Sequence, residues 1–297
     1  MPGVAVIAHG LLPSAHTARR PRTHKECHLK HWRRALFTFA AGLLAAASSH
    51  AHPVCTVVAD AATGQVLVQQ GDCATRVTSA STFKVAISLM GYDAGVLKDE
   101  HTPTLDFHPG YPDWGGAPWH EPTDPARWMK LSIFWYSEQV AKALGQARFQ
   151  QYTSAFGYGN ADVTSKQGEL SGVMGAWANS SLQISPLEQV SFMRKIVHRT
   201  LPVSAHAYDM TERITLLDAR PGGWIVHGKT GTGSPGLKYD GEHAYGWFVG
   251  WATKGPRTLV FANLIQDDKQ QAPNAGMRSR DTFLATLPAL AEPGSPQ

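Results

Sequence analysis

Ser81 and Lys84 stand three positions apart at the start of an apolar stretch of the chain. Residues three apart in a helix lie on the same face one turn from each other, so the two side chains would be neighbours. Residues 85–90 are mostly apolar, and burial of a helix there would lower the pKa of the Lys84 amine. A neutral amine beside a hydroxyl is the arrangement of a base and its nucleophile. A capped helix whose lysine extends toward solvent explains the same two residues.

Three further motifs follow this pair in order. They are Ser132-Ile133-Phe134, Tyr158-Gly159-Asn160 and Lys229-Thr230-Gly231. The last ends a strand-like run, residues 224–231, and its glycine lets the strand edge approach a ligand closely, with Lys229 facing the pocket. Singly, each motif has a structural explanation: a helix N-cap at Ser132, a turn at Tyr158 and a strand end at Lys229. Jointly, in this order, they favour an active site.

With these motifs the chain resembles the serine penicillin-recognising enzymes, and within them the class D (oxacillinase, OXA-type) β-lactamases, over nearly all of residues 52–297. Class A relatives carry Ser-Asp-Asn at the second motif, a tripeptide that this chain lacks. The segments that look like class D are Tyr158-Gly159-Asn160, Trp177 within residues 175–179, the strand 245–251 and residues 274–281. The last of these resembles the start of the family's C-terminal helix, where an arginine binds the substrate carboxylate.

Two residues depart from the family pattern. Phe134 replaces the valine of the second motif, and Ala178 replaces the leucine that usually follows the family's tryptophan. In the family these two positions flank the modified lysine. Because packed interiors tolerate volume-conserving changes best, we expect Phe134 and Ala178 to lie close together beside Lys84, with the ring in the space of the leucine.

The resemblance implies hydrolysis of β-lactams through a serine acyl-enzyme. The implied catalytic residues are Ser81, Lys84, Ser132 and Lys229, and the implied substrate-binding residues are Thr230, Gly231, Thr232, Arg280, Trp177, Tyr158 and Phe134. Ser81 would be the nucleophile, its amide and that of Thr232 the oxyanion hole, and Ser132 the proton relay to the leaving nitrogen. Lys229, Thr230 and Arg280 would bind the substrate carboxylate.

Lys84 resembles the lysine that carbon dioxide or bicarbonate converts to a carbamate (N6-carboxylysine) in class D enzymes. A carbamate is an oxygen base suited to activating the water that releases the acyl group. The resemblance implies that the Trp177 indole N–H holds it; a core tryptophan with its N–H bonded elsewhere is the alternative. We expect no other cofactor and no metal, because no histidine of residues 52–297 forms a His-Glu-x-x-His pattern and Pro122 breaks the helix that His120 would need.

Residues 1–51 have the composition of a leader that ends in a signal peptide. A basic segment (31–34) precedes an apolar one (35–47) that is too short to span a bilayer, and small residues follow at positions 49 and 51. A membrane anchor kept in the mature protein is the alternative, and residues 1–30 suggest an over-extended start site. The prediction is export to the periplasm, with residues 52–297 as a single penicillin-binding domain and no stable membrane anchor.

The charge of the exported part gives no reason to expect nucleic acid or membrane partners. Seven of the chain's 27 Lys and Arg residues but only one of its 23 Asp and Glu residues lie in residues 1–51, so the remainder carries a net charge of about −2. The implied partners are small-molecule β-lactams. The sequence leaves open the oligomeric state and the substrate spectrum, including carbapenems.

Cys55 and Cys73 form an even pair in the exported part, since Cys27 lies in the leader. Residues 56–60 and 62–68 read as two strands joined by a turn. A disulfide is therefore predicted between Cys55 and Cys73, and it would contribute about 3 kcal/mol in the chain-entropy model. Two free thiols are the alternative.

The predicted fold is α/β (α+β): an antiparallel sheet formed from both chain ends and flanked by helices, with an inserted all-helical lobe, as in the β-lactamase and transpeptidase family. Strand-like runs lie near 55–70, 223–229, 245–253 and 257–265, a helix-rich middle extends from 82 to about 200, and a closing helix covers 278–290. Ser185 and Glu188 form a capping box that predicts a helix of the middle lobe. Four tryptophans, at 114, 119, 128 and 135, are expected to pack this lobe and to form one pocket wall.

Two other functions share part of this pattern. A penicillin-binding transpeptidase has the same serine–lysine and Lys-Thr-Gly motifs but keeps its acyl-enzyme. A β-lactam sensor domain resembles class D closely but binds without turnover. Turnover of a β-lactam, compared with labelling of the protein in a single turnover, separates the three.

Overall fold

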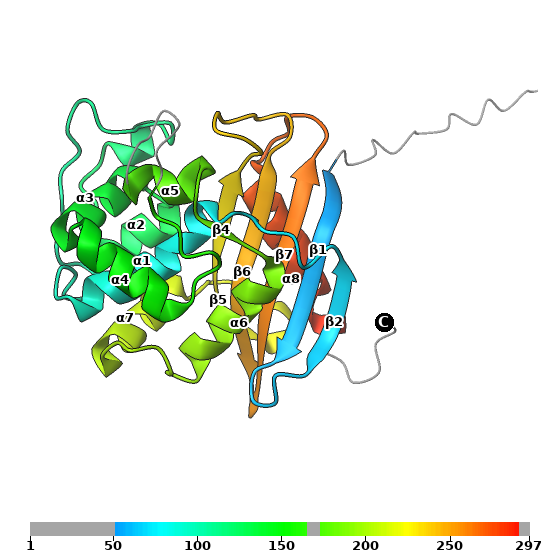
Figure 1. Ribbon diagram of the computed structural model, residues 1–297. Coiled ribbons are helices and arrows are strands. Elements are labelled where there is room, and N and C mark those ends of the chain that lie inside the picture. The colour runs from blue at the N-terminus through cyan, green and yellow to red at the C-terminus, as the bar shows by residue number, and fades with distance from the viewer. Residues whose placement is uncertain (1–50, 165–172, 291–297) are drawn as a thin grey trace, which may run out of the picture. The chain divides into compact units, whose positions relative to one another are not determined.

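The computed structural model describes residues 51–164 and 173–290. Its centre is an antiparallel sheet with strand order β2-β1-β7-β6-β5. The strands are β1 (Ala51–Asp60), β2 (Val66–Gly71), β5 (Ile225–Gly233), β6 (Tyr245–Lys254) and β7 (Arg257–Asp267). Because β1 pairs with β7, the sheet joins segments from both ends of the described chain, which confirms the predicted fold (Figure 1).

Helices cover the sheet on both faces, which explains why β6 and β7 are buried along nearly their whole length. Successive residues of a strand point to opposite faces. Accordingly, Phe248 of β6 packs in one cluster with Phe283 and Leu287 of α8 (Ala275–Leu290), whereas its neighbours Trp247 and Val249 belong to the main core. The closing helix predicted at 278–290 is therefore present and begins three residues earlier.

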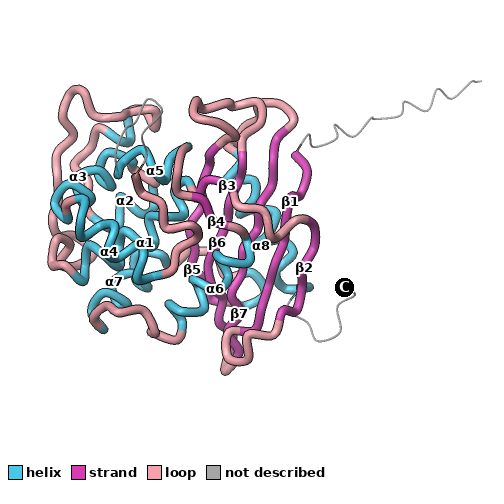
Figure 2. The backbone as a smooth tube through the Cα atoms, in the orientation of Figure 1, coloured by secondary structure: helices cyan, strands magenta, loops and turns pink. Residues whose placement is uncertain are grey.

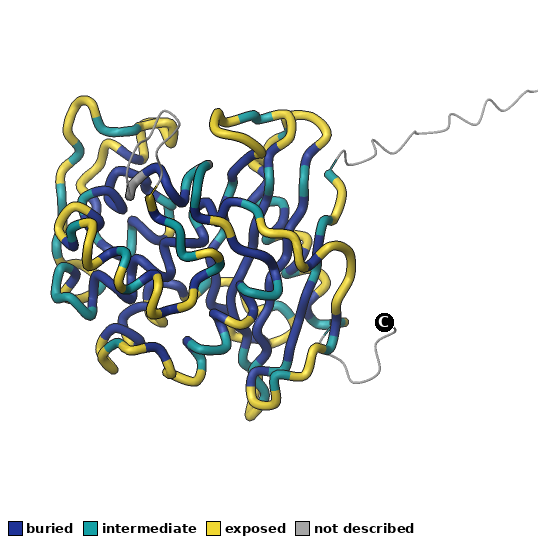
Figure 3. Tube along the Cα trace, viewed as in Figure 1, coloured by how far each residue is buried: buried dark blue, intermediate teal, exposed yellow. Residues whose placement is uncertain are grey.

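A helical lobe lies beside the edge strand β5 (Figure 2). Its helices are α1 (Lys84–Asp93), α2 (Pro125–Leu131), α3 (Phe134–Leu144), α4 (Gln146–Phe156), α5 (Val173–Asn179) and α7 (Ala205–Thr215). Short elements adjoin it: the 3-10 helices η1 (Ala80–Phe83) and η2 (Ala117–Trp119), and β3 (Val77–Thr78) paired with β4 (Gln183–Ile184). A third 3-10 helix, η3 (Pro221–Gly223), packs against α8 instead. The apolar helix α1 is buried from Lys84 to Tyr92 (Figure 3), and η1 packs on β5, so the lobe meets the sheet at the start of α1.

The predicted capping box is present at the start of α6 (Pro186–Val197). Ser185 Oγ accepts a hydrogen bond from the Glu188 amide at 3.3 Å, and the Glu188 carboxylate accepts one from the Ser185 amide at 2.9 Å. Its placement in the middle lobe is wrong, because α6 packs on β1, β6 and β7 and covers the sheet (Figure 1). The sequence period shows which side of a helix is buried, not which element buries it.

Three of the four tryptophans pack the lobe as predicted. The indole nitrogens of Trp119, Trp128 and Trp135 donate to Leu131 O, Ser137 Oγ and Trp119 O at 3.2, 2.8 and 2.9 Å. Trp114 differs: it is 64% exposed and its ring lies 4.9 Å from that of Phe134. It therefore forms an exposed wall beside the second motif.

The disulfide predicted between Cys55 and Cys73 is present, with the two Cα atoms 5.1 Å apart. Cys55 lies in β1 opposite Gly71, and Cys73 follows the end of β2. We expect thiol titration of the denatured, unreduced protein without its leader to find no free thiol, and titration after reduction to find both. Loss of the bond, in Cys55→Ser, should lower the free energy of unfolding by about 3 kcal/mol. Two reactive thiols before reduction would contradict this pairing.

The predicted leader, residues 1–51, lies outside the described residues except for Ala51, which begins β1. The proposed signal peptide within it is therefore left as a prediction. Within residues 51–164 and 173–290, no helix combines the length and the hydropathy that a membrane crossing requires.

Candidate active site

The serine–lysine motif opens the buried helix α1 as predicted. Ser81 lies in η1 and is partly exposed, whereas Lys84 begins α1 and is 0% exposed. Lys84 Nζ donates a hydrogen bond to Ser81 Oγ at 3.1 Å. The pair thus combines a hydroxyl that an external molecule can reach with an amine that water cannot reach.

Burial lowers the pKa of Lys84 well below its usual 10.5, and the nearby charge of Lys229 lowers it further. An ammonium loses most of its hydration in such a place, and the described neighbours offer it no carboxylate in return. An aromatic neighbour of the amine is Phe134, whose ring centre lies 5.7 Å from Nζ. Burial therefore favours the neutral form of the amine, the form that can accept a proton, as the interpretation of the motif requires.

The second and fourth motifs meet at a second lysine–hydroxyl pair. Lys229 Nζ, on β5, donates to Ser132 Oγ at 2.9 Å and to the Thr230 carbonyl at 2.9 Å. Lys229 is 4% exposed, and burial, with a smaller effect of the Arg280 charge, lowers its pKa to about 7. Near neutral pH this amine can therefore both hold and release a proton, next to a hydroxyl that can pass it on.

Ser132 directly follows the last residue of α2 and does not precede a helix as its N-cap. It caps the C-terminus of α2 in the left-handed conformation, with φ of 58°, so the N-cap explanation of this residue is wrong. Residues with a side chain rarely adopt that conformation, and they do so most often where the surroundings impose it. Here it brings Ser132 Oγ to Lys229.

The glycine of the Lys-Thr-Gly motif allows β5 to press against η1. A Cβ atom on Gly231 would lie 3.1 Å from Thr82 Cγ2 and 3.2 Å from the Thr82 nitrogen. Beyond it, Thr232 Oγ1 donates to Asn274 Oδ1 and accepts from the Gly276 amide, both at 3.1 Å, which ties the end of β5 to the start of α8. Thr230 and Thr232 are partly exposed along this strand end.

The two arginines at the start of α8 have different surroundings. Arg278 pairs with the buried carboxylate of Asp267 and donates to the Pro273 carbonyl at 2.8 Å, so its guanidinium is used within the fold. Arg280 pairs with its exposed neighbour Asp281 at 2.7 Å, and its charge lowers the pKa of Lys229. The arginine whose charge acts on the site is thus Arg280, the one that the sequence singles out.

Tyr158, predicted to bind substrate, lies beneath the site instead of on its surface. It is 0% exposed, and its ring lies 4.8 Å from that of Phe83. Burial raises the pKa of its hydroxyl to about 12, so the group stays protonated. In the same motif, Asn160 joins two loops, since it donates to Ser181 O at 2.7 Å and accepts from the Gln183 amide at 3.0 Å. The third motif therefore supports the site from within.

Trp177 and Phe134 form an aromatic wall next to Lys84. Trp177 is 1% exposed, and its ring lies 5.7 Å from that of Phe134. Its indole nitrogen is buried without a hydrogen-bond partner among the described residues, so the alternative of a core tryptophan bonded elsewhere does not hold within them. The predicted position of the Phe134 ring beside Lys84 is confirmed, whereas its predicted proximity to Ala178 is still only a prediction.

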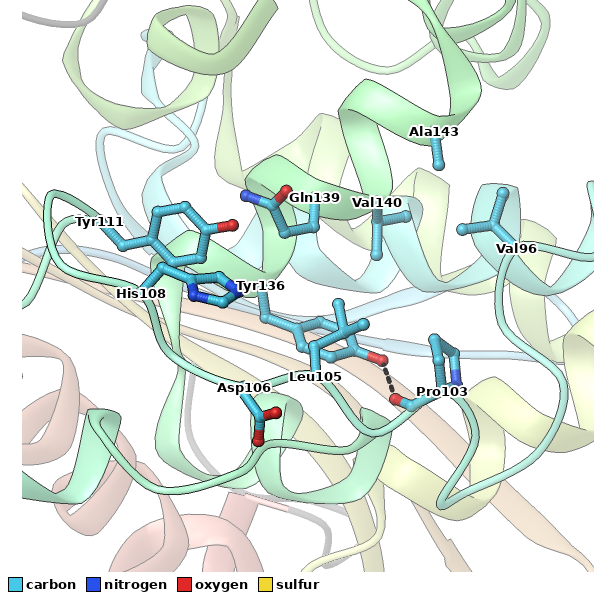
Figure 4. A pocket seen from close by; sticks show the side chains of 10 residues that line it. All are labelled: Val96, Pro103, Leu105, Asp106, His108, Tyr111, Tyr136, Gln139, Val140 and Ala143. Carbon is cyan, nitrogen blue, oxygen red and sulfur yellow. Dashed lines mark hydrogen bonds between the residues drawn. The ribbon is translucent and has the colours of Figure 1, made fainter.

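A groove of about 440 Å³, separate from the candidate active site, lies against the side of α3 that faces away from Phe134 (Figure 4). It is lined by Val96, Pro103, Leu105, Asp106, His108, Tyr111, Tyr136, Gln139, Val140 and Ala143. Its residues of α3 are half a turn around the helix from Phe134, and it contains no residue of the four motifs. Among the described residues, no group of three or more His, Cys, Asp or Glu side chains is placed to hold a metal ion.

Comparisons with known proteins point to one family. Residues 54–287 match the model of the penicillin binding protein transpeptidase domain. The chain is 40% identical to the β-lactamase OXA-9 of Klebsiella pneumoniae over 80% of this chain and 87% of that protein. It is 29% identical to the β-lactamase OXA-1 of Escherichia coli over 80% of this chain and 84% of that protein. The crystal structure of the OXA-427 class D β-lactamase matches with a TM-score of 0.74 at 43% identity, over 80% of this chain and 98% of that one.

Proposed function

The chain belongs to the OXA-type class D serine β-lactamases, which are hydrolases, and from this membership we propose that it hydrolyses β-lactams through an acyl-enzyme on Ser81. The observation that carries the proposal is the hydrogen bond of 3.1 Å between Ser81 and the buried Lys84, whose pKa is lowered well below its usual value. A nucleophile and a neutral base in contact are the minimum that acyl transfer needs.

In the proposed acylation, Ser81 Oγ attacks the lactam carbonyl carbon as its proton moves to Lys84. The amides of Ser81 and Thr232 are assigned to the carbonyl oxygen, which becomes negative as the bond forms. The carbon–nitrogen bond then breaks, and Ser132 gives its proton to the leaving nitrogen. Lys229, which donates to Ser132 at 2.9 Å, replaces that proton. Its pKa of about 7 suits a group that must give up a proton near neutral pH.

For deacylation we propose that the proton taken from Ser81 passes from Lys84 to the amine of Lys229, which gave up its own proton during acylation, and that carbon dioxide then modifies Lys84. The site fits such a group: burial favours the neutral amine of Lys84, which can react with carbon dioxide, and the Trp177 N–H, which has no partner among the described residues, offers a donor in the same buried aromatic wall. When present, the group supplies an oxygen base for the attacking water. The Phe134 ring lies 5.7 Å from Lys84 Nζ and packs against Trp177, and we expect it to limit the approach of bulk water to the lysine.

The carboxylate common to β-lactams is assigned to Lys229, Thr230 and Arg280. We expect Arg280→Ala to raise KM for several β-lactams by about 10- to 100-fold, since a hydrogen bond to a charged group is worth about 1.5–3 kcal/mol. Loss of the Arg280 charge should also raise the pKa of Lys229 above about 7. Steady-state kinetics from pH 5 to 9 measures both effects.

Arg280→Lys is the matched control, because it keeps the charge but loses the fork that binds two carboxylate oxygens. It should preserve the pKa of Lys229 and recover only part of the affinity. If KM depends instead on Arg278, whose guanidinium pairs with Asp267, the assignment of the carboxylate contact is wrong.

Turnover of nitrocefin by the purified protein, set beside labelling of the protein in a single turnover, tests the proposed function. A β-lactamase converts many equivalents of nitrocefin, whereas a transpeptidase or a sensor domain is acylated once and stops.

We also propose that the protein works in the periplasm, since a buried disulfide such as Cys55–Cys73 persists in an oxidising compartment.

A further inference from the structure

A buried hydrogen-bond network lies beneath the turn that carries Ser81, and Gln189 of α6 is its centre. Gln189 is 0% exposed. Its Nε2 donates to Thr82 Oγ1 at 2.9 Å and to the Tyr158 hydroxyl at 3.2 Å. Thr82 belongs to η1 and follows Ser81 directly. One side chain of the sheet-covering helix α6 thus reaches the turn of the nucleophile.

The number of hydrogens available determines the direction of the bond between Gln189 and Thr82. Thr82 has a single hydroxyl hydrogen, which it donates to the Ser79 carbonyl at 2.6 Å, so Thr82 Oγ1 must accept from Gln189. If the Gln189 amide were turned over, its oxygen would face a hydroxyl with no hydrogen left to give. Gln189 therefore acts on Thr82 as a donor, and a side chain without an N–H cannot replace it.

The bonds of Thr82 hold a turn that the backbone alone does not favour. Ser79 O accepts both the Thr82 hydroxyl and the Thr82 amide, the latter at 3.2 Å. Between them Ala80 has a φ of 47°, in the left-handed region that residues with a Cβ atom seldom occupy. Ser81 follows immediately. The position of its Oγ relative to Lys84 thus depends on contacts that keep this turn closed.

The opposite side of Thr82 lies against β5. A Cβ atom on Gly231 would be 3.1 Å from Thr82 Cγ2, so the strand and the turn touch with no spare room. Thr82 is therefore enclosed between Gln189 on one side and the Lys-Thr-Gly strand on the other. A displacement of Thr82 would move Ser81 with respect to Lys84 and to the end of β5 together.

We infer that Gln189 is a positioning residue for acylation: by holding Thr82, it sets Ser81 Oγ beside Lys84 and the Ser81 amide opposite the end of β5. This inference rests on the proposed role of Ser81 as the nucleophile. Gln189 itself is buried behind the turn and acts through Thr82. A misplacement of a reacting group by about 1 Å can lower a rate on the order of 10²-fold.

Gln189→Met tests the inference, because methionine has a similar length and no hydrogen to donate. The second-order rate constant for acylation by a penicillin, followed by mass spectrometry of the intact protein, should fall about 10- to 100-fold. Tyr208→Phe is the matched control on α7: it also removes two hydrogen bonds of a buried group, from the Leu201 amide and to the Leu201 carbonyl. Tyr208→Phe should be acylated at the wild-type rate. Each protein is measured at the same number of degrees below its own melting temperature, so that a loss of stability alone does not change the comparison.

Thr82→Val shows whether Gln189 acts through Thr82. The double variant with Gln189→Met should be acylated no more slowly than Thr82→Val alone, because the same contact has already been removed. Effects that multiply in full, or an equal loss of rate in Tyr208→Phe, would overturn the inference. If Gln189→Met does not fold, the comparison moves to Thr82: Thr82→Ser keeps the hydroxyl and should be acylated faster than Thr82→Val, and equal rates would overturn the inference.

The wild-type protein in the same assay separates this inference from the proposed function. A wild type that takes no adduct overturns both. A wild type acylated on Ser81, together with a Gln189→Met variant that reacts at the same rate, overturns only the role of Gln189.

Discussion

Ser81→Ala should lower β-lactam turnover by a factor on the order of 10⁶ and leave the melting temperature close to that of the wild type. Ser81 Oγ is the hydroxyl that lies 3.1 Å from the amine of Lys84, whose pKa burial lowers, and alanine has no atom that can form the acyl bond. Since Ser81 is partly exposed, the change removes a hydroxyl without opening a cavity in the core. Nitrocefin turnover measures the first effect, and thermal unfolding measures the second.

Ser191→Ala on the exposed side of α6 is the control for the loss of a serine hydroxyl, and it should turn over nitrocefin at the wild-type rate. Mass spectrometry after reaction with a slowly released penicillin should find one acyl group, on the peptide that contains Ser81. An adduct on any other peptide, or turnover that survives in Ser81→Ala, would reject the assignment of the nucleophile.

The positions of Ser81, Lys84 and Lys229 in the candidate site were predictable because each of them stands in a short motif. Ser81 and Lys84 meet by helix geometry alone, since they are one turn apart. Ser132 and Lys229 are 97 positions apart; the resemblance named both as site residues, but it was the structure that showed the hydrogen bond between them. The motifs do not indicate backbone conformation. Ser132 follows a helix in the left-handed conformation, and nothing about a serine in the sequence predicts this.

The supports of the site were harder to predict. Tyr158 carries a hydroxyl and belongs to a motif, so the sequence suggests a substrate contact, but whether a tyrosine faces a pocket or the core depends on its tertiary neighbours. Gln189 was missed because it belongs to no motif. One signal was available: it lies among Val190, Met193 and Ile196 on the buried side of α6, and a polar residue on such a side requires a buried partner.

The placement of α6 shows the same limit at the level of the fold. Its capping box and apolar period located its start and its buried side correctly. The partner of that side is the sheet, formed by residues far away in the chain, and local patterns contain no information on it. The position of α6 on the sheet matters for the proposed function, because it brings Gln189 to Thr82, next to Ser81.

The second large effect concerns the modification of Lys84. Turnover of β-lactams by the enzyme should depend on bicarbonate and should fall at acid pH. Folding lowers the pKa of Lys84 below 10.5. At pH values between the lowered pKa and 10.5, the folded protein therefore binds fewer protons at this residue than the unfolded protein does. The contribution of Lys84 to the free energy of unfolding rises with pH over this range. As the pH drops through the lowered value, the amine takes up a proton and can no longer react with carbon dioxide. Turnover should then fall on the order of 10²- to 10⁴-fold, the contribution of a general base.

This is measured with degassed enzyme at acid pH, returned to neutral pH with and without bicarbonate. Activity should come back only with bicarbonate, and ¹³C-labelled bicarbonate should give an NMR signal of the modified lysine that is missing in Lys84→Ala. Turnover that survives rigorous degassing, with no gain from bicarbonate and no labelled signal, would mean that Lys84 acts as a plain amine.

Trp177→Phe separates the indole N–H from the packing of its ring. Phenylalanine keeps an aromatic ring against Phe134 but lacks the buried N–H, which has no partner in the part of the chain that the structure describes. The modified form of Lys84 should therefore become less stable, and more bicarbonate should be needed for half of full activity. Trp128→Phe is the matched control, because that indole already donates to Ser137 at 2.8 Å; it should cost stability without changing the bicarbonate requirement. An unchanged requirement in Trp177→Phe would show that its N–H does not hold the group on Lys84.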